Sequence, residues 1–261
     1  IGSTDTHNSN PGEVEEWDFR GATTFSSSPA ERRMSEDNIT GIRNNNPGGL
    51  AAVWAPENTR EALFDAMKRK EVYATSGTRI KLRTFAGFDM PVDMAETGDL
   101  TAAYKQGVPM GGRLYASESK AEGVSLFVWA VKDPDNAPLA KLQVVKGWIE
   151  EGERQEVVYD VACGGSEFDP ATGKCEANGA TVNMNDCSWD NTVGASELKT
   201  LWTDPDYGSN EDAFYYVRVV QNPTCRWTTY DSLRLGREPL DDSPATVTEM
   251  AWGSPIWVKA K

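Results

Sequence analysis

The sequence contains very little histidine, since His7 is the one histidine among 261 residues. Hydrolytic metal sites need several ligands, and a catalytic zinc ion usually has three protein side chains and one open position. A single imidazole therefore excludes a histidine-rich metal site contained within this chain. One histidine and one nearby aspartate cannot form a hydrolytic metal site by themselves.

Positive charge is also scarce, because 26 Lys and Arg residues stand against 40 Asp and Glu residues, giving a formal net charge of -14. Such a surface repels phosphate backbones and anionic lipids, so we expect neither nucleic acid nor a membrane surface as a partner. A small anionic substrate would need a metal ion or a local arginine cluster. The chain also lacks any apolar run of about 18 residues, so we expect no membrane insertion.

Cysteine is limited to four residues in the second half of the chain, Cys163, Cys175, Cys187 and Cys225. None of them forms a Cys-x-x-Cys pair, and His7 is far away in sequence, so a zinc site is not expected. Turn-rich surroundings such as CGGSEFDPATGKC favour disulfides and hence an oxidising, periplasmic or secreted location. Free structural thiols are the alternative, and three pairings of the four cysteines remain open.

The first part of the chain predicts loops followed by one helix. Residues 1–50 include the segments TTFSSSPAERRM and GIRNNNPGGL, whose Ser, Asn, Pro and Gly residues favour turns. A helix is expected to begin at Asn58 or Thr59, either of which can cap it. Its predicted apolar face carries Leu63, Ala66 and Met67.

The rest of the chain predicts β-strands. Short runs of β-branched and aromatic residues alternate with turn material, in IKLRTF, VSLFVWAV, KLQVVKGWI, EVVYDVA and AFYYVRVV. This pattern is typical of an antiparallel β-sandwich. We therefore expect two regions, residues 1–85 with the loops and the helix, and residues 86–261 forming a sandwich with cysteine-containing loops.

The opening segment IGSTDTH places Asp5 two residues before His7. A carboxylate and an imidazole at this spacing can both face a metal ion at the end of a strand. The small residues Gly2-Ser3-Thr4 permit close approach of the backbone to such a site. The alternative is a solvated or hydrogen-bonded histidine with no ligand role, and the glutamates just downstream are expected to form a solvated acidic turn.

The segment GSTDTHNSNPGEVEE resembles the last metal-binding segment of the polymerase-and-histidinol-phosphatase (PHP) superfamily. More closely, the chain resembles the C-terminal part of the DUF3604 family, a PHP-like group. The matching segments extend over nearly the whole chain and are GSTDTH, GGLAAVWAPENTREALFDAMKRKEVYATSGTRI, LQVVKGW, VVYDVA, FYYVRVVQNPTCRWTTYDSLRLG and WGSPIWV. The resemblance implies that residues 1–85 are the last part of a distorted β/α barrel, an α/β unit placed before the all-β sandwich.

The resemblance also implies an activity, the metal-dependent hydrolysis of a small phosphate or related ester. Asp5 would be a metal ligand and the catalytic residue, bridging metal ions or accepting a proton from water, and His7 would be a second ligand. The ions would be divalent (Zn, Mn, Fe or Ca). The remaining ligands would lie upstream of residue 1, in an N-terminal part of the same protein, and the 261-residue chain alone is expected to bind metal weakly.

Three further residues are candidates for contact with the substrate. Arg79 could bind an anion, and Tyr73 and Ser76 belong to the turn YATSG after the predicted helix. The alternatives are a surface charge for Arg79, a core position for Tyr73 and a plain turn for Ser76. The rival to the hydrolase is a sandwich that binds a glycan or a protein partner without catalysis, and a third possibility is a purely structural sandwich.

Overall fold

The computed structural model describes residues 2–23, 29–35, 44–116, 123–208 and 212–260. Its helical segments are η1 (Glu16–Asp18), α2 (Ala30–Arg33), α3 (Arg60–Arg69), α4 (Met94–Thr97), α5 (Leu100–Gln106) and α6 (Trp227–Arg234). Its strands are β1 (Leu50–Val53), β2 (Val72–Thr75), β3 (Lys81–Gly87), β4 (Val108–Pro109), β5 (Arg113–Tyr115), β6 (Ser125–Val131), β7 (Leu139–Glu150), β8 (Glu153–Cys163), β9 (Phe168–Asp169), β10 (Lys174–Cys175), β11 (Glu197–Thr203), β12 (Ala213–Gln221), β13 (Thr224–Cys225), β14 (Thr246–Val247), β15 (Met250–Gly253) and β16 (Ile256–Lys259).

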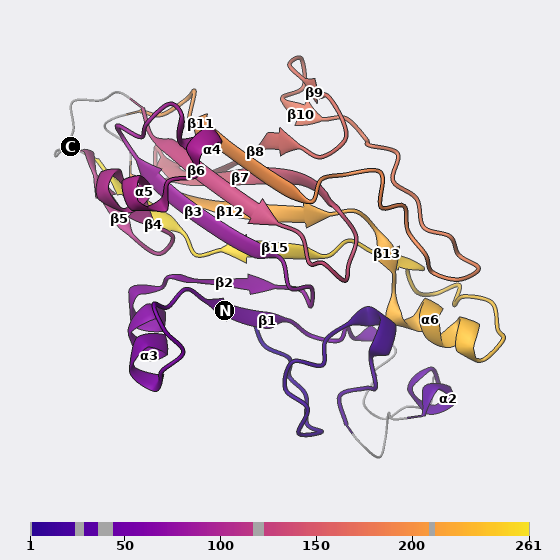
Figure 1. The fold of residues 1–261 in the computed structure, drawn as a ribbon. Coiled ribbons are helices and arrows are strands. Elements are labelled where there is room, and N and C mark those ends of the chain that lie inside the picture. The colour runs from indigo at the N-terminus through magenta and orange to yellow at the C-terminus, as the bar shows by residue number, and fades with distance from the viewer. Residues whose placement is uncertain (1, 24–28, 36–43, 117–122, 209–211, 261) are drawn as a thin grey trace.

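Two mainly antiparallel sheets account for most of these strands (Figure 1). In the larger sheet β12 pairs with β7 on one side and with β15 and β16 on the other. β8 extends this sheet beyond β7, β2 and β1 extend it beyond β15, and β5 runs parallel to β16. The smaller sheet has the order β11-β6-β3-β4. The two-stranded pairs β9–β10 and β13–β14 lie outside both sheets.

The sheets pack face to face because their strands alternate in burial. In β12, Tyr215, Val217 and Val219 are fully buried, while the residues between them are half-buried or face away from the second sheet. They share one apolar core with Leu82 and Leu126 of the smaller sheet. Figure 1 shows β3, β6 and β11 laid over β7, β12 and β15. The opposite face of the smaller sheet is covered by α4 and α5, around a second apolar cluster of Phe85, Met90, Met94, Ala103 and Phe127.

The predicted fold class is wrong, because the described residues are mainly antiparallel β-sheets and contain no β/α barrel. A barrel of that kind needs parallel strands joined through helices. The strands that flank α3 pair antiparallel instead, with Leu50 opposite Thr75, and β2 then pairs antiparallel with β15. The opening segment IGSTDTH forms no strand in residues 2–7, and β3 runs across residue 85.

The strands predicted from their residue patterns and the helix start predicted from its capping residue are confirmed. The runs in β3, β6, β7, β8 and β12 all form strands. The hydroxyl of Thr59 caps α3 by accepting a hydrogen bond from the backbone N–H of Ala62. The predicted apolar face of α3 is less buried than expected, because Ala66 is buried but Leu63 is half-buried and Met67 is exposed.

The predicted disulfides are confirmed, and the structure selects one pairing, Cys163–Cys175 and Cys187–Cys225. They close loops with sequence separations of 12 and 38 residues. On a loop-entropy model such cross-links stabilise the fold by about 3 and about 4 kcal/mol. Two structural disulfides indicate an oxidising, extracytoplasmic environment. Among the helices of the described residues, none is long and apolar enough to cross a membrane.

Candidate functional site

Close backbone packing holds the segment GSTDTH against the start of the larger sheet. A Cβ atom on Gly48 would lie 2.4 Å from the carbonyl oxygen of Thr4, and one on Gly49 would lie 2.4 Å from that of Thr75. Gly48 also has a φ of +101°, which strongly favours glycine. The N–H of Gly49 donates a 2.7 Å hydrogen bond to the carbonyl of Ser3. The glycines of NNNPGGL therefore fix the position of residues 2–5.

Asp5 lines a polar hollow of about 290 Å³ beside this packing. Three consecutive residues, Asn44, Asn45 and Asn46, line the hollow together with Asp5. Asp5 is exposed and has a φ of 50°, a left-handed conformation that Asp tolerates better than most residues. No hydrogen bond or ion pair of its carboxylate is found within the described ranges.

His7 lies two residues after Asp5 in the sequence and is exposed, but it is not among the residues that line the hollow. Its backbone N–H donates a 2.8 Å hydrogen bond to the carbonyl of Ala22, which fixes the main chain. Within the part of the chain that the structure describes, its imidazole has no hydrogen-bond partner and no cluster of three or more His, Cys, Asp or Glu residues could hold a metal ion. Carboxylate and imidazole groups are suitable ligands for divalent Zn, Mn or Fe. Asp5 and His7 supply only two such ligands, which is fewer than a complete metal site needs.

The acidic residues downstream of His7 have structural partners. Glu13 forms a 3.1 Å ion pair with Arg20. Glu15 forms an ion pair with Arg79. Glu16 is buried, in contrast to the solvated turn expected from the sequence. Val14 and Glu16, on either side of the extended residue Glu15, are both buried.

The three predicted substrate-binding residues lie elsewhere than the Asp5 hollow. Arg79 pairs with Glu15, and its backbone N–H donates to the carboxylate of Asp133. Tyr73 is a core residue whose hydroxyl donates a 3.0 Å hydrogen bond to the carbonyl of Ile80. The hydroxyl of Ser76 donates to the carboxylate of Glu249.

Two buried glutamates, Glu16 and Glu249, form a feature that the sequence did not predict. Burial, followed by the charge of Glu249, raises the pKa of Glu16 to about 8, against a lowering by the backbone N–H of Trp227 and the charge of Arg226. Burial likewise raises the pKa of Glu249 to about 7, against a lowering by the Ser76 hydroxyl. Both carboxylates come from segments far apart in the sequence, so sequence spacing gave no signal of the pair.

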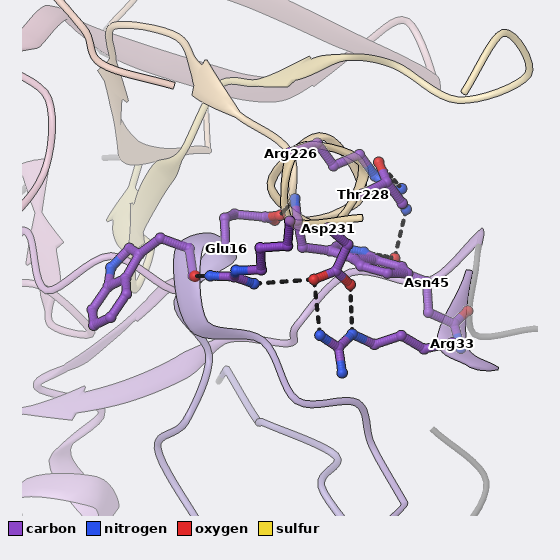
Figure 2. Close-up of polar contacts among 9 residues, drawn as sticks. Glu16, Arg33, Asn45, Arg226, Thr228 and Asp231 are labelled. Atoms are coloured by element: carbon purple, nitrogen blue, oxygen red, sulfur yellow. Dashed lines mark hydrogen bonds and ion pairs between the residues drawn. The ribbon is translucent and has the colours of Figure 1, made fainter. Parts of the chain in front are cut away.

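Glu16 joins the N-terminal segment to α6 (Figure 2). Its carboxylate accepts a 2.5 Å hydrogen bond from the backbone N–H of Trp227, the first residue of that helix. An anionic or polar acceptor at this position satisfies one of the N–H groups that a helix leaves unpaired. A buried pair lies further along the helix, where Arg33 donates to both oxygens of Asp231 at 2.6 and 2.8 Å.

α6 also positions the asparagines of the hollow. The carbonyl oxygen of Asn45 accepts hydrogen bonds from the guanidinium of Arg226 at 2.6 Å and from the indole N–H of Trp227 at 2.9 Å. Figure 2 shows Asn45 beside Arg226 and Thr228 at the start of the helix. The Asn44–Asn46 loop is therefore anchored through its backbone to the start of α6.

Comparison with known proteins gives one match. The model of the family described as "Protein of unknown function (DUF3604)" matches residues 1–260. No curated protein and no solved structure matches the chain. Because the match extends over almost the whole sequence, this chain belongs to the DUF3604 family.

Proposed function

We propose that this chain contributes Asp5 and His7 to the divalent-metal site of a hydrolase that acts on small phosphate or related esters. One observation carries the proposal. Asp5 and His7 are exposed and have no side-chain partner in the described residues, while the neighbouring glutamates are all bonded. The carboxylate of Asp5 and the imidazole of His7 are therefore free to bind a metal ion, whereas the glutamates around them already have partners.

The remaining ligands would come from an upstream part of the same polypeptide, as in PHP-like hydrolases. Divalent ions in such a site lower the pKa of bound water and neutralise charge on the ester oxygens. Asp5 would bind the metal or accept a proton from the attacking water, and His7 would bind as neutral imidazole. The compartment in this proposal is the periplasm or the exterior of the cell, in keeping with the two disulfides.

The substrate would lie in the hollow beside Asp5. The amide groups of Asn44, Asn45 and Asn46 can donate hydrogen bonds to ester oxygens. In this proposal they take the place of Arg79, Tyr73 and Ser76, whose side chains are engaged elsewhere.

The test compares Asp5→Asn and His7→Gln in the complete gene product with the wild type. The protein is stripped with chelator and reloaded with Zn²⁺ or Mn²⁺, and hydrolysis of p-nitrophenyl phosphate and bis(p-nitrophenyl) phosphate is measured with the bound metal content. Both variants should lose metal and at least about 100-fold in activity, since even residues behind metal ligands contribute about 10- to 100-fold.

Asp65→Asn is the matched control for Asp5→Asn. Asp65 is an exposed aspartate on α3, so its substitution removes the same charge at a position away from the hollow. It should retain wild-type activity and metal content. If Asp5→Asn and His7→Gln behave as Asp65→Asn does, the two residues are not ligands and the proposal fails.

A further inference from the structure

The outer face of the larger sheet carries an aromatic groove that is separate from the Asp5 hollow. The groove has a volume of about 500 Å³, within the range of about 300–1,000 Å³ that is usual for ligand pockets. Its floor is formed by Phe214 of β12 and Trp257 of β16, whose ring centroids lie 5.3 Å apart. These residues alternate with the buried core positions of their strands, so they point away from the smaller sheet.

The strand register aligns this floor in one transverse row. Glu156 of β8 is opposite Gly147 of β7, Gly147 is opposite Phe214, and Phe214 is opposite Trp257. Neighbouring strands lie about 4.8 Å apart, so the row extends about 14 Å across the sheet. β5 continues it with Arg113, which is opposite Trp257. The row has aromatic residues at its centre and Glu156 at one end, while Arg113 at the other end lies beyond the residues that line the groove.

Gly147 makes the floor flat. A Cβ atom there would lie 2.3 Å from the ring of Phe214, so the absence of a side chain lets that ring lie across the strand. Trp257 is 44 % exposed, and Ile149 at the side of the groove is 60 % exposed. Flat aromatic surfaces open to solvent bind apolar C–H faces, because the ring face carries negative charge density.

The charged residues at the rim of the groove balance one another. Two acidic side chains, Glu156 and Asp212, line it together with two basic ones, Arg154 and Lys259. Lys259 and Asp212 form an ion pair with each other. The lining therefore has no formal net charge, although the chain as a whole carries -14. A ligand complementary to this groove is uncharged, has flat C–H faces and has many hydroxyl groups for the rim.

We propose that this groove binds a neutral glycan, with pyranose rings stacked on Phe214 and Trp257. The aromatic floor would accept the C–H faces of the sugar rings. The carboxylates of the rim would accept hydrogen bonds from sugar hydroxyls, and its cationic side chains would donate to them. The proposal concerns binding, and it does not depend on the metal site at Asp5.

Isothermal titration calorimetry of the purified chain with neutral hexasaccharides tests this proposal. The probes are cellohexaose, xylohexaose, laminarihexaose and chitohexaose, and a chelator is present throughout to silence any metal-dependent reaction. We expect one of them to bind and to quench tryptophan fluorescence. Trp257→Ala should weaken that binding by about tenfold or more, the loss typical of a central aromatic contact.

Trp17→Ala is the matched control, because Trp17 is 45 % exposed, almost the same as Trp257, but lies on η1. It should bind the glycan like the wild type. The proposal is overturned if no hexasaccharide binds the wild type, or if Trp257→Ala binds as tightly as Trp17→Ala does. It is also overturned if sedimentation shows a dimer that Trp257→Ala dissociates, because the groove would then be a contact between two copies.

Discussion

The two packed sheets and the α6 region bury different chemistry. We define the α6 region as η1, the loop of residues 44–49 and α6. Between the sheets the buried side chains are mainly apolar, such as Leu126 and Val217. In the α6 region Glu16 and Asp231 are buried instead, and Asp231 is paired with the buried Arg33 of α2. The candidate metal ligands and the asparagine hollow are attached to the second region.

This difference bears on how each region responds to its surroundings. Apolar burial depends little on pH, whereas a buried carboxylate destabilises the fold whenever it becomes charged. A buried ion pair contributes little net stability compared with apolar packing, but losing one partner is costly. The sheets thus supply most of the apolar support, whereas the two buried carboxylates, Glu16 in the α6 region and Glu249 beside β15, make stability depend on pH.

Truncation in the core between the sheets should have the largest effect on stability. Leu126 is fully buried on β6, and Leu126→Ala removes apolar contacts and leaves a cavity. We expect the free energy of unfolding to fall by about 2–5 kcal/mol. Urea denaturation measures it, with Val92→Ala, at a residue 93 % exposed, as a control that should stay within about 0.5 kcal/mol. Equal losses in both variants would contradict the assignment of the core.

The buried glutamates should give a pH effect of intermediate size. The pKa values of Glu16 and Glu249 rise from 4.5 to about 8 and about 7 in the folded chain, so the folded state holds more protons than the unfolded state across this window. Their contribution to stability is complete below pH 4.5 and is lost as the pH rises to about 8. Denaturation midpoints measured along this range should fall more steeply in the wild type than in Glu16→Gln/Glu249→Gln.

Glu176→Gln is the control for this measurement, because it removes one carboxylate at an exposed position. Its pH profile should run parallel to that of the wild type. If the double variant also keeps the wild-type slope, the two glutamates do not titrate in the folded chain between these pH values.

Asp5→Asn should have the smallest effect on stability, within about 0.5 kcal/mol, because exposed side chains without partners contribute little. Thermal unfolding of the wild type and the variant measures the difference. An unchanged melting temperature together with lost activity would separate the role of Asp5 from the structural role of Glu16. A destabilisation above about 1 kcal/mol would instead make Asp5 a structural residue of its loop.

Local features of the sequence were sufficient for several elements. Alternating apolar residues predicted β3, β6, β7, β8 and β12, since a strand with one buried face requires a period of two. Thr59 predicted the start of α3. The cysteines predicted disulfides from their turn-rich surroundings, but their pairing depends on which loops meet in space.

The prediction of a β/α barrel was wrong, and β1 and β2 show why. The order of strand, helix and strand in residues 50–75 is common to parallel and antiparallel arrangements, and strand direction depends on partners far along the chain. β15, at residues 250–253, provides the antiparallel partner of β2. Nothing in the local pattern of residues 50–75 specifies that pairing.

By itself the sequence determined the charge of the chain, the cysteine content, the alternating strands and the Asp5-x-His7 spacing. Tertiary structure alone decided that the charge of Glu249 acts on Glu16, that α6 holds the Asn44–Asn46 loop, and that Phe214 lies across Gly147 beside Trp257. The physical reason is the distance along the chain over which each effect acts. Periodicity, charge and turn preference act between near neighbours in the chain, whereas burial, pKa shifts and grooves arise where distant segments exclude water together.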